Sequence, residues 1–294
     1  MHLLLLPVRI AVAAFRQFLA DEGWAIASHI ALSTLMSMFP FIIVVTALAA
    51  FFFGSKELAD EAARILLEAW PKQVAAPIAD DIHGVLTNAN GSVLTFGVVF
   101  ALYFASSGVE SLRIALNRAY NAVDPRSMWL TRLESIGYVI VGAVALLAFS
   151  FLVVLAPLIW AALIYYVPKL EPFGYFVTFA RFTVAAIVIV IALTILHRWL
   201  PAGRRRFADV APGIAVTLLL WLVSGAIFGR YLADFAFGYV RLYAGLASAM
   251  VALIFLYICA SIFIYGAELN STIVAARSKR VQDAEAPVAS STSS

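Results

Sequence analysis

The stretch FGYFVTFARFTVAAIVIVIALTILH, residues 173–197, decides the fold class of this chain. Before its final histidine it contains one charged side chain, Arg181. A run of about twenty apolar residues is the length that a helix needs to cross the hydrocarbon core of a bilayer. Since lipid offers the backbone amides no partners, a segment of this kind must satisfy them within a helix. The stretch therefore predicts a transmembrane helix.

Five further apolar runs have comparable length, and the composition of the whole chain agrees with them. The runs cover residues 27–53, 92–112, 136–166, 208–230 and 243–267. Of the 294 residues 64% are hydrophobic and 13% are charged, whereas a soluble domain carries about a quarter charged residues. Too few polar side chains remain to coat a soluble core of this size. We expect an all-α membrane protein with about six transmembrane helices.

The placement of basic residues predicts how these helices are oriented. Thirteen of the 20 lysines and arginines fall in the segments that alternate onto the side of the N-terminus. Cytoplasmic loops carry the excess of Lys and Arg in membrane proteins. The pattern predicts a multi-pass protein of the bacterial cytoplasmic (inner) membrane with both termini cytoplasmic.

The chain divides into three regions on the same pattern. Residues 1–22 read as a cytoplasmic amphipathic helix at the membrane interface, with a cleaved or inserted leader as the alternative. Residues 23–276 form the six-helix transmembrane domain, whose outer connection 54–91 reads as two short amphipathic helices. Residues 277–294 begin basic and continue as a polar tail that we expect to be disordered.

Four stretches together resemble a known family of membrane proteins. They are ASHIALSTLMSMFPFIIVV (27–45), SLRIALNRAYN (111–121), WLPAGRRRFADVAPGIAVTLLLWLVSGAIFGRYL (199–232) and YAGLASAMVALIFLYICASIFIYGAELN (243–270). Over nearly its whole length the chain resembles the YihY/BrkB family of bacterial inner-membrane proteins, once labelled ribonuclease BN. Ser28-His29 stands where many members carry Ala-Tyr. The resemblance implies six spans and a cytoplasmic-membrane location, and it supplies no agreed activity, although links to envelope lipid export have been proposed for members.

The residues themselves give no support to an enzyme. The four histidines, His2, His29, His83 and His197, are scattered over both sides of the predicted membrane domain. The chain contains no HExxH, GxSxG or P-loop motif. We expect no catalytic residues, no metal site and no cofactor, and the old ribonuclease label finds no basis here.

Several polar residues close the predicted spans at the cytoplasmic side. Because an ionisable group within a span costs about 2.5–3.5 kcal/mol or more, each needs a partner or a wet cavity. We hypothesise a polar vestibule at this depth, with ion pairing at the interface as the alternative. Its residues would be Glu110, Glu268, Asn270, His29, Arg113 and His197.

Arginines mark two further candidate sites. Arg181 lies deep within its span, where it would bind an anionic lipid headgroup or pair with Asp234 or Glu171. Arg204, Arg205 and Arg206 are candidates for contact with anionic lipid on the cytoplasmic leaflet, although setting the topology would also explain them.

Two function classes follow from these features. The first is a transporter or flippase-like exporter of an anionic or lipid-related envelope component. The second is a lipid-binding or scaffolding membrane protein of the cell envelope that transports nothing. Membrane lipids, anionic ones included, are the expected partners, nucleic acid is not, and a homo-oligomer stays open.

Overall fold

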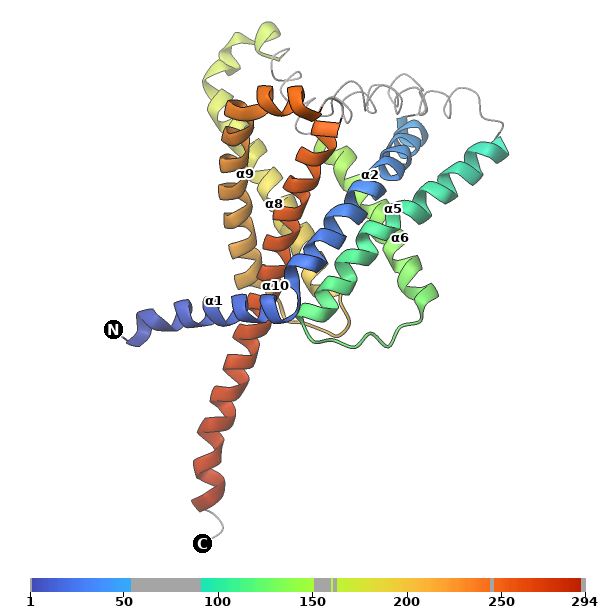
Figure 1. The fold of residues 1–294 in the computed structure, drawn as a ribbon. Helices are drawn as coiled ribbons and strands as arrows, with labels where there is room; N and C mark the ends of the chain where they lie inside the picture. The colour runs from blue at the N-terminus through green and yellow to red at the C-terminus, as the bar shows by residue number, and fades with distance from the viewer. Residues whose placement is uncertain (1, 54–90, 151–159, 161–162, 244–245, 292–294) are drawn as a thin grey trace.

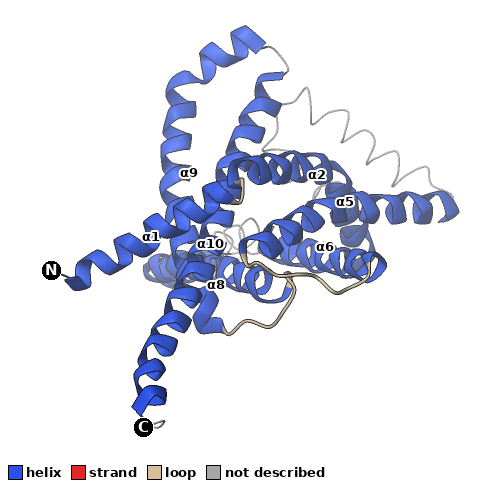
Figure 2. Ribbon diagram, turned by 60° about the horizontal axis from the view of Figure 1, so that its bottom comes forward, coloured by secondary structure: helices blue, strands red, loops and turns tan. Residues whose placement is uncertain are grey.

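The computed structural model describes residues 2–53, 91–150, 160, 163–243 and 246–291. Within these ranges the chain is helical and contains no strand (Figures 1 and 2). The elements, in chain order, are α1 (His2–Ala20), α2 (Gly23–Phe53), α5 (Gly91–Ala119), α6 (Met128–Ser150), the 3-10 helix η2 (Pro168–Phe173), α8 (Gly174–Trp199), α9 (Phe207–Tyr243) and α10 (Leu246–Ser291).

Five of the described segments are long and apolar enough to cross a membrane. They are Gly97–Ala119, Met128–Leu147, Gly174–Trp199, Phe207–Leu232 and Ala249–Lys279. The helical class and the multi-pass character are thereby confirmed. α2 covers the remaining predicted span as a helix of 31 residues but is not among the five. The number six stays a prediction, as does the cellular side of the termini.

The apolar segment of α6 begins at Met128, before residue 136, where the sequence predicted the third span to start. Two charged residues, Arg132 and Glu134, lie in the first two turns of the helix. In the structure, Glu134 Oε2 forms an ion pair with Arg126 Nη1 at 2.5 Å. The Arg132 guanidinium lies 4.2 Å from the centre of the Tyr103 ring. Both charges therefore have partners, and the helix extends through them.

The bundle has its core where α2, α5, α9 and α10 meet. α2 packs along α5 and α10, α10 packs along α9, and α6 covers α5 and α2 from the other side. One apolar cluster joins α5, α8, α9 and α10 and contains Leu116, Leu193, Val210, Ile214 and Phe263. Dispersion and close packing hold such helices together in lipid, where no hydrophobic effect drives association.

α8, the helix from which the fold class was predicted, is mostly exposed. Its buried residues are Leu193 and His197, both in the last two turns. Its main helical neighbour is α9. A helix that is apolar all round and exposed over most of its length suits a lipid environment.

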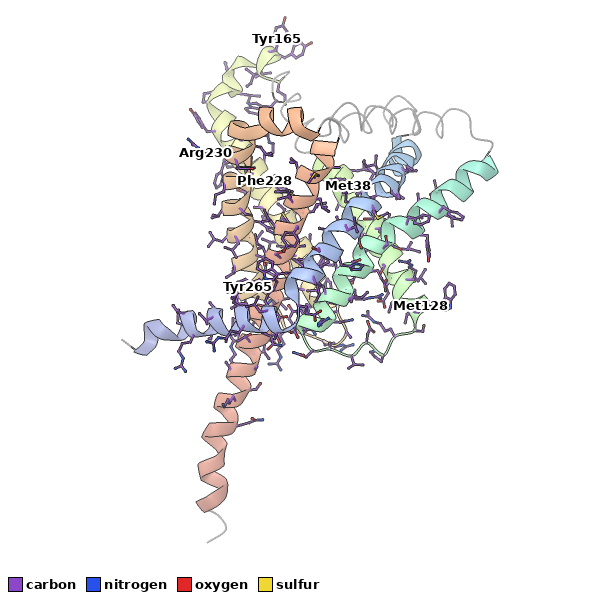
Figure 3. The ribbon with its side chains drawn as sticks, in the orientation of Figure 1. Met38, Met128, Tyr165, Phe228, Arg230 and Tyr265 are labelled. Atoms are coloured by element: carbon purple, nitrogen blue, oxygen red, sulfur yellow. The ribbon has the colours of Figure 1, made fainter. Side chains whose placement is uncertain are left out.

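Both termini and the loops 120–127 and 200–206 lie at the same end of the bundle, which we call the basic end (Figure 1). α1 lies across α10 there, and Tyr265 sits at their crossing (Figure 3), where its hydroxyl donates to the Ala11 carbonyl at 3.2 Å. On α1, Ala14 and Phe18 are buried, whereas Val8 and Val12 are exposed. These features agree with an interfacial helix, whose contact with a membrane stays a prediction.

The C-terminal region differs from its prediction. α10 continues as a helix to Ser291, although residues 282–294 had been expected to be disordered. This stretch contains Gln282, Glu285 and three alanines, which are good helix formers. It can therefore extend a helix that the transmembrane part has already nucleated. The predicted outer helices of 54–91 lie, apart from Gly91, outside the described residues.

Candidate functional site

Two loops at the basic end are fastened to each other by side-chain hydrogen bonds. The side-chain oxygen Oδ1 of Asn117 accepts a hydrogen bond from the backbone N–H of Ala202 at 2.7 Å. Arg126 donates from Nη2 to the carbonyl of Leu200 at 3.1 Å. The loop that follows α5 and the loop that follows α8 are thus held side by side (Figure 2).

Arg126 is itself held by carboxylates. It donates to Asp124 Oδ1 at 2.8 Å and to Asp124 Oδ2 at 2.7 Å, which is a bidentate pair. The hydrogen bond from Arg126 lowers the pKa of Asp124 to about 2, and Asp124 in turn raises the pKa of Arg126. Glu134 is a second anionic partner of Arg126, so the guanidinium is held by contacts within the protein.

Behind these loops, a chain of hydrogen bonds joins α8, α9 and α10 to Tyr120, the residue directly after α5. The backbone N–H of Gly213 donates to Asn270 Oδ1 at 2.6 Å. Asn270 Nδ2 donates to the hydroxyl of Tyr120 at 3.2 Å, and the same hydroxyl oxygen lies within hydrogen-bond distance of His197 Nδ1, at 2.9 Å. His197 and Asn270 are 0% and 1% exposed. We call Gly213, Asn270, Tyr120 and His197 the polar junction.

The polar junction depends on a close approach between α9 and α10. A Cβ added to Gly213 would collide with the Gly266 carbonyl oxygen and with the Asn270 amide. One added to Gly266 would collide with Thr217 Oγ1. Small residues at both positions bring the backbones together, as is typical of helix pairs in membranes.

Arg205 connects the polar junction to the surface. Its guanidinium lies 4.0 Å from the centre of the Tyr120 ring, and Nη1 donates to the Ala202 carbonyl at 2.9 Å. Burial raises the pKa of Tyr120 to about 12. Burial likewise lowers the pKa of Arg205. The tyrosine is thus flanked by a cation on one face and by the junction at its hydroxyl.

A cavity of about 520 Å³ opens beside Arg205 at the basic end. We call it the arginine pocket. Its lining consists of Pro125, Arg126, Arg198, Trp199, Pro201, Ala202, Gly203, Arg204 and Arg205. Four of these nine residues are arginines and none is acidic, so the arrangement favours an anion.

The six residues of the hypothesised vestibule fall into separate groups. Asn270 and His197 meet in the polar junction, through Tyr120. Glu110 instead forms an ion pair with Arg113, one turn along α5, and accepts from Ser135 Oγ of α6 at 3.1 Å. The structure thus pairs Glu110 with a neighbouring arginine, and the position of this pair at the membrane interface stays a prediction.

The other two vestibule residues lie apart from the junction. His29 is exposed on α2, with Nε2 3.4 Å from Ser111 Oγ. Glu268 is 0% exposed, and neither of its carboxylate oxygens has a hydrogen-bond partner among the described residues. Asp21 and Arg118 are the charged groups whose fields reach it. Although Glu268 and Asn270 are two positions apart, a helix points such residues to different faces.

Arg181 is half-buried on α8, far along the chain from the junction residue His197. Its guanidinium lies 5.4 Å from the centre of the neighbouring Phe182 ring. The side chains of Glu171 and Asp234, its predicted partners, lie outside the described residues. Arg204 and Arg205 line the arginine pocket, whereas Arg206 is exposed beyond it.

The sequence alone had not assigned a role to Asn117, Tyr120, Asp124 or Arg126. Asn117 in the last turn of α5 and Tyr120 directly after the helix are three residues apart, a spacing that puts both on one side of the chain. That spacing was a readable signal within the SLRIALNRAYN stretch. In the part of the chain that the structure describes, no group of three or more His, Cys, Asp or Glu side chains is placed to hold a metal ion.

Fold and site together define an all-helical, multi-pass membrane protein with buried polar side chains and an arginine pocket at one end. The chain belongs to the family described as Virulence factor BrkB, whose family model matches residues 14–290. The resemblance to the YihY/BrkB family is thereby confirmed.

Two relatives extend this assignment. A Bacillus subtilis protein named ribonuclease-like protein YfkH is 26% identical over 259 residues, which are 88% of this chain and 93% of the relative. The UPF0761 membrane protein RC1_0578 of Rhodospirillum centenum is 25% identical, over 88% of this chain and 56% of its own length. No solved structure matches the chain.

Proposed function

We propose that this protein is a transporter or flippase-like exporter that moves an anionic or lipid-related component of the cell envelope. It would lie in the cytoplasmic (inner) membrane of a bacterium, with the basic end and both termini on the cytoplasmic side. Anionic membrane lipids would be its partners, and neither nucleic acid nor a cofactor enters the proposal.

The observation that carries the proposal is the polar junction. Polar and ionisable groups inside apolar spans are expensive and mark substrate or ion pathways by default. The junction draws on α5, α8, α9 and α10, and α8 is joined to the core mainly at this end. A helix attached in this way can move relative to its neighbours at the cost of few packing contacts, which an exporter requires.

The buried atoms without partners give the site unused bonding capacity. Among the described residues, His197 Nε2 and Thr217 Oγ1 are buried with no hydrogen-bond partner. An orphaned buried donor or acceptor costs about 1–3 kcal/mol. Such groups suit a site that changes partners during a transport cycle.

A scaffolding protein that binds lipid without moving it is the second candidate. The tight contact of Gly213 with Gly266 and Asn270 favours it, because a rigid joint between α9 and α10 serves a static bundle equally well. We propose no enzymatic activity in either case. The term ribonuclease-like is part of the name of the Bacillus subtilis relative and refers to that protein.

Reconstitution separates the two candidates. The purified full chain is placed in phosphatidylcholine vesicles that contain fluorescent phosphatidylglycerol, with and without an imposed pH gradient and membrane potential. Quenching of the outer leaflet with dithionite then reports lipid movement. If the protein moves lipid, fluorescent phosphatidylglycerol from the inner leaflet should become accessible to dithionite faster than in protein-free vesicles under at least one of these conditions. Rates equal to those of protein-free vesicles under all of them would select the scaffold.

A further inference from the structure

The arginine pocket contains two arginines whose charges the described residues leave uncompensated. Arg126 already has Asp124 and Glu134 as partners, and Arg205 lies on Tyr120 and donates to Ala202. Arg204 is exposed and has neither a hydrogen-bond partner nor an ion-pair partner among the described residues. The described contact of Arg198 is the Trp199 ring, 5.6 Å from its guanidinium.

The loop that carries Arg204 and Arg205 is shaped so that the two side chains diverge. Gly203 has φ +88°, a left-handed conformation that L side chains rarely adopt. Immediately after it, Arg204 is exposed at the pocket and Arg205 turns inward onto Tyr120. Arg205 thus packs against the protein, and Arg204 stays available for a ligand.

The walls of the pocket are fixed before any ligand arrives. The loop 120–127 is fastened to the loop 200–206 through Asn117, Ala202, Arg126 and Leu200. Preorganised donors lose little entropy on binding, so the same contacts give higher affinity. The cavity of about 520 Å³ falls within the range of about 300–1,000 Å³ that is usual for small-ligand pockets.

Guanidinium groups favour one ligand chemistry over others. An arginine stays charged at any physiological pH, and its planar donors match the oxygens of a phosphate bidentately. Two unpaired guanidiniums at one cavity provide donors for a tetrahedral anion, and Trp199 supplies an apolar wall beside them. The absence of acidic side chains from the lining removes the repulsion that a phosphate would otherwise meet.

We infer that the arginine pocket is a phosphate-binding site, with Arg198 and Arg204 as the binding residues and Arg126 and Arg205 as positioning residues. The phosphate would be borne by a membrane lipid headgroup or by a soluble compound, since both present the same oxygens. This inference adds a substrate class to the proposed function, and it rests on the proposed function for the reason why the protein would bind a phosphate. Binding itself is measured without transport, so failure of the lipid-movement assay would leave the site standing.

The test uses the full chain in nanodiscs of phosphatidylcholine, and the variants Arg198→Gln, Arg204→Gln and their combination. Arg206→Gln is the matched control, because Arg206 belongs to the same basic run, is exposed and does not line the pocket. In one arm, titration of inorganic phosphate is followed by calorimetry. In the other, phosphatidic acid is mixed into the nanodisc lipid, and native mass spectrometry measures how much phosphatidic acid the protein retains relative to phosphatidylcholine.

We expect each pocket variant to weaken binding about tenfold or more in at least one arm, as befits the loss of a charge-assisted pair. We expect Arg206→Gln to bind like the native chain. Loss confined to phosphatidic acid identifies a lipid headgroup, and loss of inorganic phosphate binding as well identifies a general phosphate site. The inference is overturned if the native chain binds neither probe, if the double variant binds as the native chain does, or if Arg206→Gln weakens binding equally.

Thermal unfolding of each variant guards against loss of fold as the cause. We expect the native melting temperature for Arg198→Gln and Arg204→Gln, since neither side chain has a described hydrogen-bond partner. A pocket variant that unfolds early is replaced by Arg204→Lys, which keeps the charge and loses the bidentate geometry. Full phosphate affinity in that lysine variant would contradict bidentate recognition.

Discussion

Asn270 of α10 donates its side-chain amide to the hydroxyl of Tyr120 at the end of α5, at 3.2 Å, across 150 residues of sequence. The same hydroxyl lies 2.9 Å from His197 Nδ1 of α8. One tyrosine oxygen therefore joins three helices at the level of the arginine pocket. Arg205, which lines that pocket, lies on the ring of the same tyrosine.

Removal of this oxygen should destabilise the bundle. In Tyr120→Phe, Asn270 and His197 each lose a partner while both stay buried. Leaving such groups unsatisfied costs about 1–3 kcal/mol, so we expect a lower melting temperature in detergent. Tyr175→Phe is the control, because Tyr175 is 93% exposed on α8. Equal melting temperatures for Tyr120→Phe and the native chain would show that the junction contributes nothing to stability.

The loop at Asp124 should make stability depend on acidity. Arg126 lowers the pKa of Asp124 from 3.8 to about 2, so the folded state binds this proton less tightly than the unfolded state. Stability from the pair is therefore complete above about pH 4 and is lost as the pH falls toward about 2. Thermal unfolding between pH 6 and pH 2.5 should show this loss in the native chain and a shallower one in Asp124→Asn. Parallel curves for the two proteins would refute the assignment.

Gly213 should tolerate no side chain, because α9 and α10 touch there. In Gly213→Ala, the new methyl group would press on the Gly266 carbonyl and the Asn270 amide. Overpacking of this kind costs about 1–3 kcal/mol. Gly225→Ala on the same helix has open space around it and should be neutral or slightly stabilising. The contact is disproved if chemical unfolding gives both variants the same stability.

The orientation in the membrane can be measured with single cysteines in a Cys259→Ala background. Ser127 is exposed in the loop 120–127 at the basic end, and Tyr175 is exposed at the start of α8, the opposite end of that helix from His197. If the basic end is cytoplasmic, an impermeant thiol reagent labels Ser127→Cys in inside-out vesicles only. It should label Tyr175→Cys in right-side-out vesicles only. The reverse pattern would place the arginine pocket outside the cell.

The positions of the helices could be predicted because lipid imposes one rule on every span. Apolar runs of sufficient length must be helical, and α8, α9 and α10 begin within a few residues of the predicted starts. α6 begins earlier than its predicted span, and Arg132 and Glu134 lie in its first two turns. Only the fold reveals that Tyr103 and Arg126 are their partners.

The candidate site could be predicted only in part. His197 and Asn270 stood out as polar residues closing apolar spans, and the structure brings them together. Glu110 and Arg113 stood out equally, yet they pair with each other. Which polar residues meet depends on the rotation of each helix about its axis. A single sequence does not specify that rotation, because a lipid-facing surface and a helix-facing surface are both apolar.

Tyr120 and Arg126 were missed for a related reason. Tyrosines and arginines at span ends are usual interfacial anchors, so their position alone did not indicate which residues they contact. Their roles come from the contact between two loops that lie 74 residues apart in sequence, as the Arg126–Leu200 bond shows. Loop pairing of this range becomes visible only in three dimensions.

The central claim is that an anionic component is moved through a bundle whose basic end binds its phosphate. Its most direct measurement compares the rate of phosphatidylglycerol movement in vesicles containing the native chain, the Arg198→Gln/Arg204→Gln variant or Arg206→Gln. The account predicts movement with the native chain and with Arg206→Gln, and a rate close to that of protein-free vesicles with the pocket variant. Equal rates for the native chain and a correctly folded pocket variant would contradict it.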